Sequence, residues 1–166
     1  PMRIIRLLIL FVLLATLGSA QPAKPSFVEI QRSIVRYMEC IECQSGELDT
    51  IIKKGDDALP YLEAILMRGP SGGRKEAYRQ KLREDYAALE AYNKSNDKLK
   101  VLTPTQYESY YLSNFINTYR IRAAIAMHQS GAKERLDKIS KDINTPAEVK
   151  YAIEEALRWF FLSLHF

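Results

Sequence analysis

The chain has 166 residues and a mass of 19.1 kDa, and 47% of its residues are hydrophobic while 27% are charged. This length and composition suit one globular domain and exclude a disordered or collagen-like chain. Two Cys are too few for a disulfide-dense mini-protein. The formal net charge of +4 is unevenly distributed, because residues 1–20 contain two Arg and no acidic residue.

Residues 1–20 have the pattern of a secretory signal peptide. Arg3 and Arg6 precede an apolar stretch over residues 7–17, and small residues follow as far as Ala20. A retained membrane anchor is the alternative, but the stretch after Arg6 has only 14 residues when counted as far as Ala20, fewer than the roughly 20 that a membrane-spanning helix needs. We therefore expect cleavage after Ala20 and a periplasmic or secreted protein, which contacts the membrane only if this segment stays uncleaved.

Removal of the signal peptide would change the charge balance of the chain. The rest of the chain has 22 basic and 20 acidic side chains, a net charge of +2. A nucleic-acid-binding protein needs clustered Lys and Arg to neutralise several phosphates, so we expect no nucleic-acid partner. The mature chain is predicted to consist of a flexible leader over residues 21–25 and a single domain over residues 26–166.

The predicted domain shows the spacing of apolar residues, by three and four, that is typical of amphipathic helices. No segment shows the sustained alternation of a strand, so we expect an all-α fold of about seven helices with no sheet. The expected helices cover residues 26–43, 47–53, 58–68, 74–93, 104–130, 132–143 and the chain from 146 onward.

Helix starts are marked by local capping signals. A Ser or Thr followed three residues later by Glu or Gln can form a capping box. Such boxes are predicted at Ser26-Phe27-Val28-Glu29, Thr103-Pro104-Thr105-Gln106 and Thr145-Pro146-Ala147-Glu148. Asp56 or Asp57 is expected to cap the helix that follows, and Pro70–Gly73 is expected to be the most flexible interior stretch.

Several segments of the chain resemble HEAT repeats. In residues 119–131, basic residues and alanines precede a Gly turn, and spaced aliphatic residues follow in 132–143. Residues 47–69 are similar to the helix-Gly-helix joint of such a unit, with Gly55 at the joint, and residues 146–159 look like the first helix of the next unit. The resemblance implies a right-handed α-α superhelix that binds other proteins, and it carries no catalytic residue.

Small residues in the long helix over 104–130 predict close packing on two sides. Ala123, Ala124 and Ala126 allow neighbouring helices to approach closely, while Ile125 contributes to an apolar stripe. A helix that is packed on two sides is what stacked helical pairs require.

Cys40 and Cys43 form the only motif with intrinsic reactivity. In an exported protein we expect the two to be oxidised to a local structural disulfide at the end of the first helix. A dithiol redox function is an alternative, although the βαβ surroundings of a thioredoxin-like motif are missing. Free thiols or a metal are further alternatives; zinc would need four ligands, and only His128 and His165 could add to the two Cys. We predict no metal and no cofactor.

No group of residues in the sequence indicates catalysis. His128 is expected near the C-terminal end of its helix, where the helix dipole favours the imidazolium form. A catalytic triad or dyad would need a nucleophile and an orienting group that the sequence does not indicate. We therefore expect a binding module with no catalytic residues.

Ten Tyr are the most unusual feature of the composition. Tyrosine suits both a core with a wet edge and a recognition surface, because it combines a large apolar area with a polar group. Their helical spacing favours the core, and any that are exposed are candidate anchors for a partner. On a concave helix face, the expected partner-binding residues are Tyr78, Tyr86, Arg120 and Arg122.

Together these patterns predict an exported, non-enzymatic helical-repeat protein that binds another protein. The alternative function is that of an extracytoplasmic thiol-disulfide protein that uses the Cys40/Cys43 pair.

Overall fold

The computed structural model describes residues 26–40, 45–94 and 102–163. The predicted signal peptide, the leader and Cys43 lie outside this part of the chain. Within it there are seven α-helices and no strand, so the all-α prediction is confirmed. The helices are α2 (Phe27–Glu39), α3 (Ser45–Ile52), α4 (Leu59–Arg68), α5 (Gly72–Lys94), α6 (Pro104–Gln129), α7 (Lys133–Lys141) and α8 (Ala147–Ser163).

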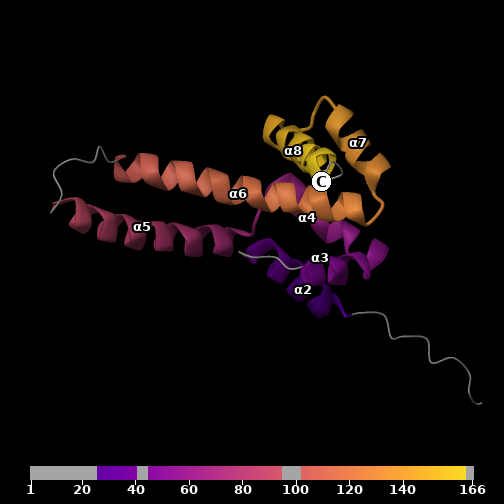
Figure 1. The fold of residues 1–166 in the computed structure, drawn as a ribbon, viewed down its shortest axis with the longest axis horizontal. Helices are drawn as coiled ribbons and strands as arrows, with labels where there is room; N and C mark the ends of the chain where they lie inside the picture. The colour runs from indigo at the N-terminus through magenta and orange to yellow at the C-terminus, as the bar shows by residue number, and fades with distance from the viewer. Residues whose placement is uncertain (1–25, 41–44, 95–101, 164–166) are drawn as a thin grey trace, which may run out of the picture.

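Helix α6 is the central element of the fold. It contacts each of the other described α-helices. Its N-terminal half lies along α5, and the two form an arm that extends to one side of the molecule (Figure 1). Its C-terminal half passes between α7 and α8 on one side and α2, α3 and α4 on the other, and we call this part of the molecule the body (Figure 1).

The core of the body surrounds the C-terminal half of α6. Ala123, Ala124, Ala126 and Met127 are completely buried, which agrees with the close packing expected from the alanines. A helix with buried small residues can be approached closely by its neighbours, and helices on both sides of α6 cover these residues. The largest fully buried side chains are Ile34, Met38, Ile51, Leu62, Leu66, Met127, Val149 and Ile153.

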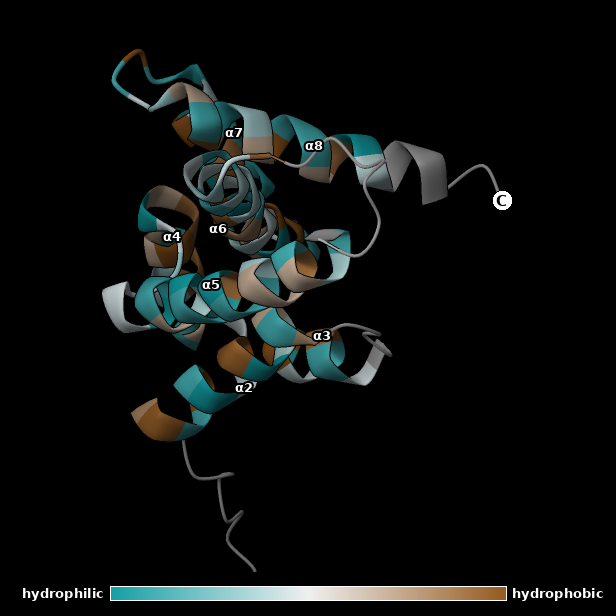
Figure 2. Ribbon diagram, turned by 90° about the vertical axis from the view of Figure 1, so that its left-hand side faces the viewer, coloured by the Kyte–Doolittle hydropathy of each residue, from teal (hydrophilic) through white to brown (hydrophobic). Residues whose placement is uncertain are grey.

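The arm has a different character from the body. Figure 2 shows α5 as a largely hydrophilic helix, and among its described side chains only Leu82 is buried. Because a helix with so narrow an apolar stripe can cover only one neighbour, α5 packs against α6 and leaves its other faces in solvent. None of the described helices combines the length and apolarity that crossing a membrane requires.

Two of the predicted capping boxes are confirmed. The Ser26 hydroxyl accepts the backbone N–H of Glu29 at 3.3 Å, and the Glu29 carboxylate accepts the N–H of Ser26 at 2.8 Å. Thr103 and Gln106 make the same reciprocal pair, with distances of 3.3 and 3.0 Å. These bonds satisfy N–H groups that have no partner within the helix, so α2 and α6 begin where the sequence indicates.

The predicted aspartate cap of α4 is not formed. Residues Gly55–Asp57 make a 3₁₀ turn, and Ala58, which has no capping side chain, precedes α4. The backbone N–H of Ala58 donates to the carbonyl of Gly55 at 3.0 Å. Because the turn runs directly into α4, neither Asp56 nor Asp57 is in the cap position.

The start of α5 also differs from the expectation of a flexible stretch over Pro70–Gly73. Gly72 and Gly73 are already helical, and the hydroxyl of Ser71 accepts the N–H of Arg74 at 3.4 Å. Gly69 holds the preceding turn at a φ of 71°, where a Cβ would lie 2.9 Å from Cγ2 of Ile116. The close contact with α6 therefore positions the beginning of α5.

The packing of α6 predicts that Ala124→Leu destabilises the protein. The larger side chain would enter a fully packed region, which costs about 1–3 kcal/mol in comparable cores. Ala88→Leu is the matched control, because Ala88 is exposed on α5. Urea unfolding followed by far-UV circular dichroism should show a lower midpoint for Ala124→Leu alone. Equal midpoints for the two variants would contradict the packing described for α6.

Candidate functional site

Aromatic rings line the contact between the two helices of the arm. Tyr78 of α5 stacks on Phe115 of α6, with ring centroids 4.0 Å apart and planes inclined by 9°. Phe115 in turn meets the edge of Tyr119 at 4.9 Å. Nearer the tip of the arm, Tyr86 meets Tyr107 at 5.4 Å in a T-shaped arrangement. Such pairs stabilise a fold by more than the burial of their apolar area alone, so they help to hold α5 against α6.

Polar contacts reinforce the same interface. The hydroxyl of Tyr86 donates to the backbone carbonyl of Leu102 at 2.9 Å. Glu108 of α6 pairs with two guanidinium groups of α5, Arg79 at 3.5 Å and Arg83 at 3.3 Å. Exposed ion pairs contribute little each, about 0–1 kcal/mol, so these contacts supplement the aromatic packing of the arm.

Tyr110 and Tyr111 form an exposed aromatic pair on the outside of the arm, which we call the arm patch. Their side chains are 58% and 38% exposed, and their ring centroids lie 5.1 Å apart with planes at 87°. Tyr111 also contacts Tyr107, with centroids 4.5 Å apart. The interface with α5 therefore supports the patch from beneath while leaving its outer surface open.

The four residues predicted to bind a partner do not lie on one face. Tyr78 and Tyr86 pack inside the arm, as described above. The guanidinium of Arg120 lies 3.5 Å from the carboxylate of Glu148 in α8, and the Arg120 side chain is only 12% exposed. The periodicity of the sequence predicts which residues share a stripe on one helix, but the neighbour that covers the stripe depends on how the helices pack.

Arg122 binds the C-terminal end of α2. Its Nη1 donates to the carbonyl oxygens of Tyr37 at 3.1 Å and Met38 at 2.8 Å, and it lies 4.0 Å from Sγ of Cys40. The last carbonyls of a helix have no partner within the helix, and a cation there also interacts favourably with the helix dipole. Arg122 therefore joins α6 to α2 inside the body.

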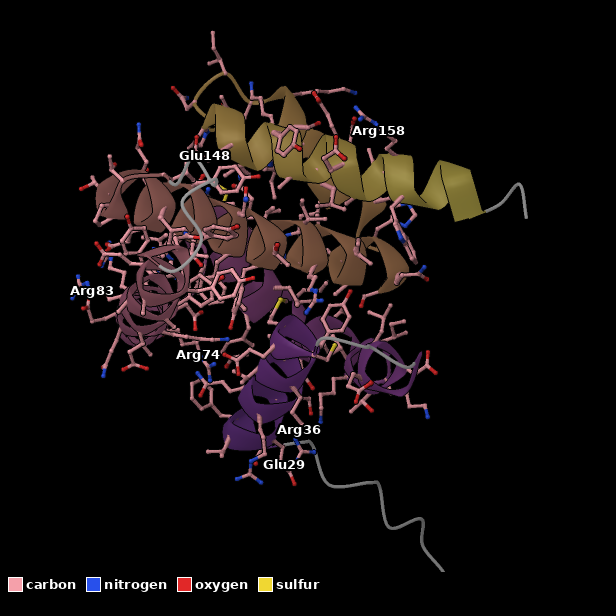
Figure 3. The ribbon with its side chains drawn as sticks, turned by 60° about the vertical axis from the view of Figure 1, so that its left-hand side comes forward. Glu29, Arg36, Arg74, Arg83, Glu148 and Arg158 are labelled. Atoms are coloured by element: carbon pink, nitrogen blue, oxygen red, sulfur yellow. The ribbon has the colours of Figure 1, made fainter. Side chains whose placement is uncertain are left out.

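A second set of polar contacts joins three helices at the base of the arm. The Tyr119 hydroxyl of α6 donates to the Glu39 carboxylate of α2 at 2.7 Å, and the Arg74 guanidinium of α5 pairs with the same carboxylate. Figure 3 shows Arg74 between α5 and α2. Burial raises the pKa of Tyr119, and the neighbouring Arg74 and Arg122 oppose that shift.

Of the four residues that could take part in redox or metal chemistry, the structure describes Cys40 and His128. Cys40 is not a free thiol, while Cys43 lies outside the described residues, so the bridge between them stays a prediction. Burial lowers the pKa of His128, and Lys133 lowers it further. His128 does lie in the last turn of α6, and both effects oppose the influence of the helix dipole, which favours the imidazolium form. Within the described ranges no cluster of three or more His, Cys, Asp or Glu could hold a metal ion.

Comparison with known proteins identifies no relative: no protein-family model, no curated protein and no solved structure matches the chain. The all-α class is established by the helices themselves.

Titration of Tyr37 predicts a loss of stability at alkaline pH. This side chain is 5% exposed, and burial raises its pKa from 10.0 to about 12, although Arg122 opposes the shift. Between these two values the unfolded chain loses the phenolic proton while the folded protein keeps it. The free energy of unfolding must therefore fall as the pH rises from 10 to 12.

Two pKa units correspond to about 3 kcal/mol, which is an upper value for this contribution. Urea unfolding at pH values near 9 and near 12 measures the loss. Tyr37→Phe is the control, because Lys and the other Tyr titrate in both proteins. We expect a smaller loss in the variant, and the same loss in both proteins would show that Tyr37 titrates normally.

Proposed function

We propose that the protein is an exported helical scaffold that binds a partner protein through the arm. The observation that supports this proposal is the arm patch of Tyr110 and Tyr111, which is exposed on a pair of helices that projects from the body (Figure 1). Large exposed aromatic residues are enriched at the energetically dominant positions of protein interfaces. The export follows from the signal-like pattern of residues 1–20.

The construction of the arm suits a recognition surface. Helix α5 has 23 residues, which corresponds to a length of about 35 Å. The stacked and T-shaped rings between α5 and α6 hold the patch in place before a partner arrives. A preformed surface loses less conformational entropy on binding, so more of the contact energy contributes to affinity.

We also propose that the part of the chain from α4 to α8 is HEAT-like. Helices α4, α6 and α8 contact one another in succession, and α7 packs against both α6 and α8. Stacked helical pairs produce such contacts between every second helix. Helices α2 and α3 depart from this pattern, because both also contact α6.

Tyr110→Ala combined with Tyr111→Ala should strongly weaken partner binding without unfolding the protein. Each substitution removes exposed aromatic area, and loss of an interface anchor lowers affinity by about tenfold or more. Affinity capture by the mature protein from its own envelope fraction measures binding at near-physiological salt. Tyr151→Ala is the matched control, because Tyr151 is 49% exposed on α8.

Photocrosslinking provides an independent measurement of the same surface. A photoreactive phenylalanine at position 110 should form a discrete adduct, whereas one at position 143, which is 89% exposed outside the arm, should not. Equal adducts from both positions, or unchanged capture by the double variant, would contradict a binding site on the arm.

The contact between Arg122 and Cys40 favours a second candidate function, that of a thiol-disulfide protein. A cation 4.0 Å from the sulfur would stabilise the thiolate formed when a bridge to Cys43 is reduced. A stabilised thiolate makes a disulfide easier to reduce, which a redox protein requires and a structural bridge does not.

Replacement of both Cys by Ser distinguishes the two functions. If the protein is a scaffold, Cys40→Ser with Cys43→Ser should keep partner capture, and the reduction potential of the parent bridge should lie below about −300 mV, as structural disulfides do. The potential is measured by equilibration of the pair with defined thiol buffers. A higher potential together with loss of function in the Ser variant would favour the redox function.

A further inference from the structure

A cavity of about 720 Å³ lies where α2, α4 and the beginning of α5 meet. Its volume is within the range of about 300–1,000 Å³ that small-molecule sites occupy. Much of its wall is apolar, and Tyr119 of α6 completes it. The apolar lining consists of Ile34, Val35 and Met38 from α2 and Ala64 and Ile65 from α4, beside the ring of Tyr61.

The charged residues of the lining are all cationic. They are Arg68 at the end of α4 and Arg74 and Lys75 in the first turns of α5, and no Asp or Glu is among the lining residues. The Lys75 ammonium donates to the carbonyl of Arg68 at 3.2 Å, and Arg74 pairs with Glu39, which lies outside the lining. An ammonium has three N–H donors and a guanidinium five, so these contacts leave donors for a ligand.

The backbone adds to the positive character of this wall. Ser71 and Gly72, at the N-terminal end of α5, also line the cavity, and the first turn of α5 has no acidic residue. The N-terminal end of a helix carries partial positive charge. The cavity therefore has an apolar part between α2 and α4 and a cationic part where α4 ends and α5 begins.

We propose that this cavity binds an amphipathic anion, a single hydrocarbon chain that ends in a carboxylate. The hydrocarbon chain would lie against Ile34, Val35 and Ile65, and the carboxylate would lie near Arg68 and Lys75. An apolar molecule without a charge would leave the cationic wall unused, and an amphipathic cation would be repelled by it. This proposal does not depend on partner binding by the arm, because none of its residues belongs to the arm patch.

Isothermal titration calorimetry with decanoate, below its micelle concentration, tests the proposal on the mature protein. We expect saturable binding of one decanoate per chain. Decyltrimethylammonium has a hydrocarbon chain of similar length with the opposite charge, and acetate and inorganic phosphate have the negative charge without the chain. Each should bind at least about 100-fold more weakly, a difference of about 3 kcal/mol. Equal binding of decanoate and decyltrimethylammonium would overturn the proposal, and so would equal binding of decanoate and acetate.

Ser71→Asp tests the cationic wall without damage to the fold. Asp is as good an N-cap as Ser, so α5 should form normally, but the new carboxylate would lie at the cavity and repel the ligand. We expect decanoate affinity to fall by about tenfold or more, and Ser71→Asn, which keeps the cap without the charge, should bind as the parent does.

Thr105→Asp is the matched charge control. It adds the same charge in the first turn of α6, roughly 20 Å along that helix from Tyr119, and it should leave decanoate binding unchanged.

Ala64→Phe, which fills the apolar part of the cavity, should weaken binding with no change in charge. Thermal unfolding of each variant establishes that it is folded. Parent-like binding by both Ser71→Asp and Ala64→Phe would show that the cavity is not the site.

Discussion

The burial of the C-terminal half of α6 is the constraint on which the rest of the structure depends. Residues Ala123, Ala124 and Ala126 have no exposed surface, and their small size lets helices approach α6 from both sides. The buried apolar side chains described in the body form one cluster, to which the C-terminal half of α6 contributes. Because α6 contacts every other described α-helix, it links the parts of the body to one another.

Polar contacts then define how α2 and α5 are placed around this centre. Arg122 satisfies the last carbonyls of α2, while Tyr119 and Arg74 both bind the Glu39 carboxylate. Each contact requires its two groups to lie within bonding distance, so together these contacts favour one placement of α2 over others. Tyr119 also packs against Phe115 of the arm and lines the cavity, so the same residue contributes to both.

The same helix has two different environments along its length. The C-terminal half of α6 is surrounded by the body, whereas the N-terminal half has α5 as its neighbour and carries Tyr110 and Tyr111 on its outer side (Figure 1). Aromatic rings form much of the contact between α5 and α6, and Leu82 is the one buried side chain among those described on α5. A tyrosine can pack there and keep its hydroxyl in water. This explains why a protein of this fold is rich in Tyr.

The sequence by itself determined the helices, because helix formation depends on local patterns. The spacing of apolar residues and the reciprocal bonds of Ser26 with Glu29 and Thr103 with Gln106 involve residues at most one turn apart. Only the tertiary structure decided which side chains remain exposed to a partner, because other helices, far away in the chain, cover the rest. Arg122 contacts residues 84 and 85 positions away, and Arg120, Tyr78 and Tyr86 are also covered by other helices. The cavity likewise arises only where α2, α4 and α5 meet, since its lining residues come from all three helices and from Tyr119 of α6.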